Sequence, residues 1–65
     1  MKVRYFEDTD TLYIELSDRA PAQTEELNDN VMIELDKDGK VVGLTIEHAK
    51  AAQGKLDFSY ETVAA

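Results

Sequence analysis

Two stretches of this chain alternate apolar and polar residues on both sides of a turn, which is the pattern of a β-hairpin. The stronger stretch, residues 31–46, has Asp38-Gly39 at its centre. Asp-Gly favours a two-residue type I′ turn, because both central residues of that turn need a positive φ. Gly43 leaves a gap on the polar side, which indicates a bulge or the close approach of another backbone. A turn centred on Asp38-Gly39 pairs the apolar residues of one face as Leu35 with Val42, Ile33 with Leu44 and Val31 with Ile46.

The other hairpin spans residues 3–16, with strands predicted over residues 2–7 and 11–17 around a turn at Thr9-Asp10. In a single register, all of its large aliphatic residues fall on one face. A shift by one residue would move them to the opposite face, so burial should enforce this register. The predicted register pairs Val3 with Leu16, Tyr5 with Ile14 and Glu7 with Leu12 on one face, and Arg4 with Glu15 and Phe6 with Tyr13 on the other.

Three weaker elements complete the prediction. Residues 22–27 form an edge strand, because Glu25 and Glu26 discourage unwanted pairing with other chains. Residues 47–53 are the best helix-forming stretch, and Gly54 stands where a C-terminal cap would. Within residues 55–63, apolar and polar residues alternate again and indicate a sixth strand. The pairing of the segments at 22–27 and 55–63 stays open.

The expected fold is a single mainly β domain over residues 1–65, an antiparallel meander of five to six strands built on two hairpins, with one short C-terminal helix. A domain near this size buries only about 60% of the surface of its unfolded chain. No cysteine is present to add a disulfide. We therefore expect a second copy to bury further surface, most simply in a two-fold homodimer.

The net charge of −7 limits the partners of this protein. Such a charge repels nucleic-acid phosphates and anionic lipids, so we expect neither nucleic-acid nor membrane binding. It favours solubility or a basic protein partner. The chain shows no secretory signal at its start and no run of about 20 apolar residues, and it is free of cysteine. These features favour the cytoplasm.

No group of residues specifies an enzyme, a cofactor site or a metal site. Residues 36–39 resemble the start of a calcium loop, but the sixth position, which needs glycine, is Val41. The carboxylates of Asp8, Asp10 and Asp18 fall in predicted turns and not in a dry pocket. His48 is the only histidine, and neither a nucleophile nor an orienting group accompanies it in a recognisable pattern.

Apolar residues also occur on the outer face of the predicted sheet, and they are candidates for a contact surface. The helix and the last strand are the alternative cover for them. The candidates are Phe6, Tyr13, Met32 and Val41, with Tyr60 on the C-terminal segment as a further anchor.

Four segments carry a family resemblance: Val3 to Asp18, Thr24-Glu25-Glu26-Leu27, Val31 to Asp36 and Asp38 to Glu47. Over residues 2 to about 48 they resemble the domain of unknown function 2283 family. The resemblance implies a small, mostly antiparallel β domain of prokaryotic type with no assigned biochemistry. It also implies that some relatives are encoded beside small toxin-like proteins.

Two function classes follow. The leading hypothesis is a non-catalytic protein–protein interaction module, an acidic partner that neutralises a small basic, toxin-like protein. The alternative is a small-molecule binder or minor enzyme with its site at a dimer junction, lined by Tyr13, Tyr60 and nearby carboxylates. A purely structural role is not separated from these by the sequence.

Overall fold

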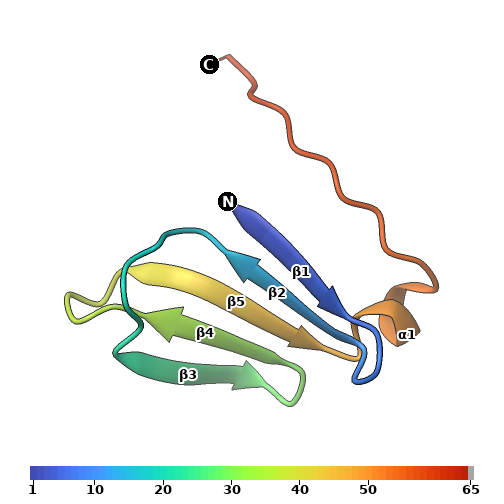
Figure 1. Ribbon diagram of the computed structural model, residues 1–65, viewed down its shortest axis with the longest axis horizontal. Helices are drawn as coiled ribbons and strands as arrows, with labels where there is room; N and C mark the ends of the chain where they lie inside the picture. Colours follow the sequence, from blue (N-terminus) through green and yellow to red (C-terminus); the bar gives the residue numbers. More distant parts are fainter. Residues whose placement is uncertain (65) are drawn as a thin grey trace.

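The computed structural model describes residues 1–64, which form one antiparallel sheet of five strands followed by a short helix (Figure 1). The strand order is β1-β2-β5-β4-β3, so the hairpins β1–β2 and β4–β5 meet where β2 pairs with β5. The mainly β fold built on two hairpins is therefore confirmed. The elements are β1 (Lys2–Phe6), β2 (Thr11–Glu15), β3 (Gln23–Asn28), β4 (Val31–Leu35), β5 (Val41–Glu47) and α1 (Ala49–Gln53).

The β4–β5 hairpin has the predicted register over most of its length. Val31 faces Ile46 and Ile33 faces Leu44, but Leu35 faces Val41 and not Val42, because the register shifts at that end. The type I′ prediction is wrong, since Gly39 has a φ of 82° while Asp38 is not among the residues with positive φ. The carboxylate of Asp36 explains the wider turn, because it accepts hydrogen bonds from the backbone N–H groups of Asp38 and Lys40, both at 2.9 Å.

The β1–β2 hairpin pairs two residues away from the predicted register. Val3 faces Ile14 and Tyr5 faces Leu12, and the connection is a four-residue turn over residues 7–10. Asp10 closes this turn with a φ of 53°. A shift of two residues leaves every side chain on its predicted face. The pairs corrected by this finding are Val3–Leu16, Tyr5–Ile14, Glu7–Leu12, Arg4–Glu15 and Phe6–Tyr13.

The remaining elements differ from the prediction mainly at the C-terminal end. The predicted strand at 22–27 is β3, an exposed edge strand that pairs with β4. The helix starts at Ala49 and not at residue 47, because β5 continues to Glu47 and His48 turns the chain with a φ of 57°. Gly54 caps α1 as expected. Residues 55–64 form no strand, so the sixth strand is absent from the described part of the chain.

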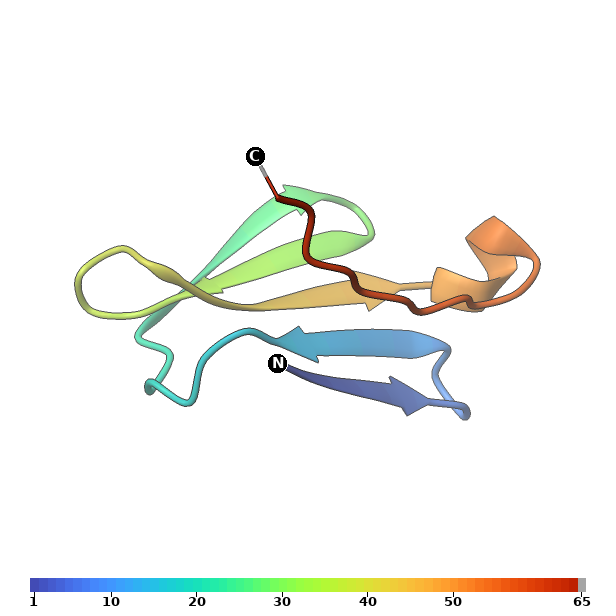
Figure 2. The ribbon, with the colours of Figure 1, turned by 90° about the horizontal axis from the view of Figure 1, so that it is seen from above.

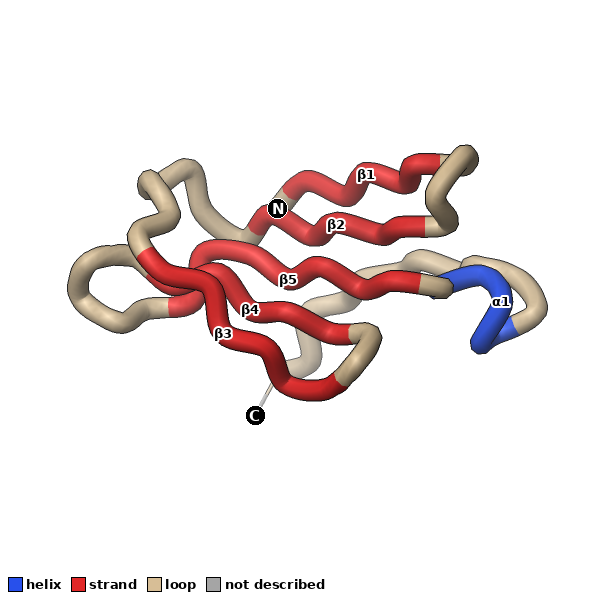
Figure 3. The backbone as a smooth tube through the Cα atoms, turned by 90° about the horizontal axis from the view of Figure 1, so that it is seen from below, coloured by secondary structure: helices blue, strands red, loops and turns tan. Residues whose placement is uncertain are grey.

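The sheet is one twisted layer, with α1 at one end (Figure 3). Most of its large apolar side chains share one side, which we call the apolar face. Only part of this side is covered, because α1 is five residues long and the C-terminal tail, residues 55–64, passes the sheet without joining it (Figure 2). The apolar face consists of Val3, Tyr5, Leu12, Ile14, Val31, Ile33, Leu44 and Ile46, extended at one end by Leu16 and Val42.

Candidate contact surfaces

The predicted contact residues do not form one patch. Tyr13 and Met32 lie in one row across the opposite side of the sheet, which we call the outer face, because both are paired with Thr45. Phe6 ends β1 near α1, whereas Val41 begins β5 at the other end of the sheet. Phe6 and Val41 are 46% and 41% exposed. The row of Glu15, Gly43 and Glu34 separates Val41 from Tyr13 and Met32, so the outer face offers no continuous apolar surface.

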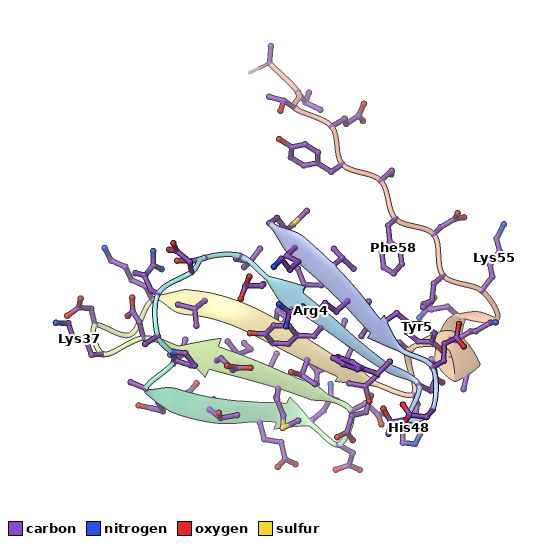
Figure 4. The ribbon with its side chains drawn as sticks, viewed as in Figure 1. Arg4, Tyr5, Lys37, His48, Lys55 and Phe58 are labelled. Atoms are coloured by element: carbon purple, nitrogen blue, oxygen red, sulfur yellow. The ribbon has the colours of Figure 1, made fainter. Side chains whose placement is uncertain are left out.

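Tyr13 packs against Gly43 at the centre of the outer face. A Cβ built on Gly43 would lie 2.6 Å from the Tyr13 hydroxyl oxygen, so the gap at this glycine is filled by a ring and not by another backbone. The register shift next to Gly43, between Glu34 and Leu35, agrees with the other predicted possibility, a bulge. Burial, followed by the charges of Glu34 and Glu15, raises the pKa of Tyr13. Arg4 is paired with Tyr13 and lies over the middle of the sheet (Figure 4). The centre of the outer face is therefore a protonated phenol among charged side chains.

Tyr60 belongs to the other side of the molecule. It lines a shallow groove with Phe58 of the tail and with Val3 and Ile14 of the apolar face. Neighbouring residues of a strand point to opposite faces, so Tyr13 and its neighbour Ile14 lie on different sides of β2. One chain therefore does not bring Tyr13 and Tyr60 into a common site.

The apolar face is only partly covered, although burial of its side chains was expected from the sequence. Its residues do share one face, but Val3 and Leu16 are 38% and 46% exposed. Among residues 1–64, the buried apolar side chains are those of Leu12, Val42 and Ala49. The signal that was available in the sequence is the shortness of the helix, which covers only one end of a five-stranded sheet.

Asp10 anchors the helix to the first hairpin. Its carboxylate accepts hydrogen bonds from the N–H groups of Lys50 and Ala51, at 2.8 and 3.0 Å, and from the Tyr5 hydroxyl at 2.7 Å. The bond from Lys50 is the largest of the effects that lower the pKa of Asp10. His48 directly precedes α1 and is exposed, with its Nδ1 3.0 Å from Asn30 Oδ1. Asp10 is thus a structural cap.

Asp36, the first residue of the calcium-like segment, also has a structural partner. It is 6% exposed and accepts a hydrogen bond from Arg19 Nε at 2.7 Å, in addition to its bonds from the turn. The Lys40 N–H contributes most to lowering the pKa of Asp36. The ion pair ties the β2–β3 connection to the β4–β5 turn. Within the described residues, no three His, Asp or Glu side chains are grouped so as to hold a metal ion.

None of the helices described in residues 1–64 has the length and apolar character that a bilayer span requires. Residues 2–50 match the model of a family described as "Protein of unknown function (DUF2283)", from the start of β1 into α1. No curated protein and no solved structure matches the chain. Because the match covers most of the 65 residues, the chain belongs to the DUF2283 family.

Proposed function

We propose that this protein is a non-catalytic interaction module of the cytoplasm, which acts as a homodimer and binds a basic protein partner. The observation that carries the proposal is the open apolar face. A surface of this kind marks a site of protein–protein contact. Its occupant in this proposal is the same face of a second copy.

The small interior of one copy supports the homodimer. Three apolar side chains are buried in residues 1–64, and a chain of this size gains little net stability from so small a core. Two sheets that pack face to face lie about 10 Å apart and share the side chains of their inner faces. The molecule measures 35 × 33 Å along its two long axes, which is sufficient for the about 800 Å² per partner of a standard interface.

The acidic surface supports the basic partner. The chain carries 14 acidic and 7 basic side chains. Glu25 and Glu26 lie on β3, where all six residues are exposed. Complementary charge speeds and orients the encounter of two proteins. Packing of the two apolar faces leaves the outer faces free for this contact, including Glu26, which is paired with Met32 there.

Substitution of one residue on each face tests the homodimer. Leu16 on the apolar face and Phe6 on the outer face are both 46% exposed, so Leu16→Ser and Phe6→Ser form a matched pair. We expect Leu16→Ser to raise the dimer dissociation constant by tenfold or more in sedimentation equilibrium, and Phe6→Ser to leave it within about twofold. A monomeric wild type, or a dimer that is lost only with Phe6→Ser, contradicts the proposal.

The basic partner is tested separately. A protein that co-purifies from the native host is identified by mass spectrometry, and its association rate with the pure protein is then measured against salt concentration. We expect a basic partner and an association rate that falls at least tenfold between about 20 and 500 mM salt. An acidic partner, or a rate that does not change with salt, contradicts this part of the proposal.

One groove favours the alternative of a small-molecule binder. It has a volume of about 510 Å³ and lies between α1, the tail and the end of the apolar face. Its apolar lining includes Leu12, Ile46, Ala52, Leu56 and Phe58. A thermal-shift screen with metabolites distinguishes this role, because a ligand that binds only the folded protein raises its melting temperature. We expect no such rise, and a rise abolished by Ala52→Trp would favour the alternative.

A further inference from the structure

We propose that the two copies of the dimer exchange their tails, so that residues 56–62 of each copy pair with β1 of the other as a sixth strand. This inference rests on the proposed homodimer and names the segment that completes it. Four observations carry it: the pattern of the tail, the open edge of β1, the charges of both segments and the position of the tail above its own sheet.

The tail has the pattern of a strand without a strand partner in the described residues. Leu56, Phe58 and Tyr60 alternate with polar residues, as in a strand with one apolar side. Phe58 and Tyr60 are 53% and 80% exposed. Phe58 points from the tail towards β1 (Figure 4). The tail therefore has the sequence of a strand, and it needs the edge of a sheet with which to pair.

β1 offers such an edge. It ends the sheet on one side, and four of its five residues are exposed. The outward N–H and C=O groups of an edge strand are free to pair with another strand. β1 has neither a proline nor an irregular register to block this pairing.

Charge selects β1 over the other edge. In an antiparallel register with Arg4 opposite Ser59, the apolar residues of the tail extend the apolar face. The same register places Glu61 opposite Lys2, and Asp57 diagonal to Arg4, on the outer face. Opposite charges in such positions stabilise a pair of strands, whereas like charges destabilise it. The edge at β3 carries Glu25 and Glu26 and would repel the acidic residues of the tail.

The position of the tail favours exchange over pairing within one chain. Leu56 and Phe58 line a groove with Leu12 and Ile46, so the tail starts above the apolar face and not at its edge. A second sheet about 10 Å away needs this same space. The three steps along the chain from Gln53, the end of α1, to Leu56, the first residue of the new strand, span at most about 10 Å, which is the width of such a gap, and Gly54, with a φ of 82°, provides the turn. Reciprocal exchange closes the dimer about a two-fold axis.

Introduced cysteines test the exchange, because the chain has none of its own. Arg4→Cys and Ser59→Cys proteins are mixed, oxidised and analysed by non-reducing electrophoresis and peptide mass spectrometry. We expect a disulfide between residues 4 and 59 of different chains. The control replaces Arg4→Cys by Lys37→Cys, in the turn at the far end of the sheet from α1 (Figure 4), and should give no cross-link. No cross-link in the first mixture, or an equal yield in the control, overturns the proposal.

The double variant Arg4→Cys/Ser59→Cys distinguishes exchange from pairing within one chain. We expect covalent dimers, and an internal disulfide in a monomer overturns the proposal. A charge reversal gives an independent measurement in dimers that keep the apolar face. Lys2→Glu/Arg4→Glu and Asp57→Lys/Glu61→Lys should each raise the dimer dissociation constant about tenfold, and their combination should restore it. If neither pair changes the constant while Leu16→Ser does, the exchange is wrong and the homodimer stands.

Discussion

At the scale of single residues, two carboxylates that resemble candidates for chemistry hold the backbone in place. Asp36 accepts bonds from two turn N–H groups and from Arg19, and Asp10 accepts them from α1 and Tyr5. A carboxylate that accepts several N–H bonds is favoured in its charged form. Both residues therefore link pH to the stability of the fold.

Asp36 predicts a loss of stability in acid. Its pKa is lower in the folded protein than the ordinary value of 3.8, so its contribution is fully present above that value and is lost as the pH falls through the folded pKa. In urea unfolding between pH 7 and pH 2, Asp36→Asn should show a smaller loss of stability at acid pH than the wild type. Asp38→Asn, at an exposed position of the same turn, is the control and should follow the wild type. Parallel curves for all three proteins contradict the assignment.

Gly43 predicts a second effect at this scale. A Cβ there would lie 3.1 Å from Cζ of Tyr13 as well as 2.6 Å from its hydroxyl oxygen, so the ring must move. Gly43→Ala should lower the free energy of unfolding by about 1 to 2 kcal/mol. The same change should cost almost nothing in a Tyr13→Ala background, where the ring is absent. A double-mutant cycle measured by urea unfolding gives this coupling, and additive effects would show that the contact does not constrain the sheet.

At the scale of elements, the sequence predicts those strand registers and element boundaries that depend on residues close together along the chain. The β4–β5 register follows from Asp38-Gly39 and from alternation. The β1–β2 register depends on the loop length, which Asp10 sets through a bond to Lys50, 40 residues away. Alternation could not detect the error, because a shift of two residues keeps Val3 and Tyr5 on the same face. The predicted start of the helix, at residue 47, was too early for a similar reason. Pairing with Thr11 on β2 holds Glu47 in β5.

The dependence of α1 on Asp10 predicts a local effect. A helix of five residues has too few internal bonds to be stable alone, so its order comes from tertiary contacts. Asp10→Ala should therefore raise the amide exchange rates of Lys50 and Ala51 at least tenfold while β5 stays protected. Asp8→Ala, an exposed position in the same turn, is the control. Unchanged exchange at Lys50 would show that other contacts hold the helix.

At the scale of the whole molecule, the two faces of the sheet differ in how well the sequence predicts them. The apolar face was predicted residue by residue. Whether it is covered depends on the path of the tail, and the alternation of apolar and polar residues does not determine that path. On the outer face, Phe6, Tyr13, Met32 and Val41 were candidates for an apolar contact patch, with cover by the helix and the last strand as the alternative. It is instead interrupted by Glu15 and Glu34, because both are paired with Gly43 in the row beside Tyr13 and Met32.

The partly exposed apolar face affects the thermal stability of the whole molecule. If a second copy completes the core, unfolding is coupled to dissociation, and the melting temperature rises with protein concentration. A tenfold change in concentration corresponds to about 1.4 kcal/mol, which for a dimer of this size shifts the melting temperature by about 4 to 6 °C. Calorimetry of the wild type from 5 to 500 μM should show this slope, and Phe6→Ser should keep it. Leu16→Ser should reduce this slope at the lower concentrations, where its weaker dimer dissociates, because the lost contact lies on the shared face. A wild-type melting temperature that stays constant over this hundredfold range would mean that one sheet, with Val3 and Leu16 in water, is stable by itself.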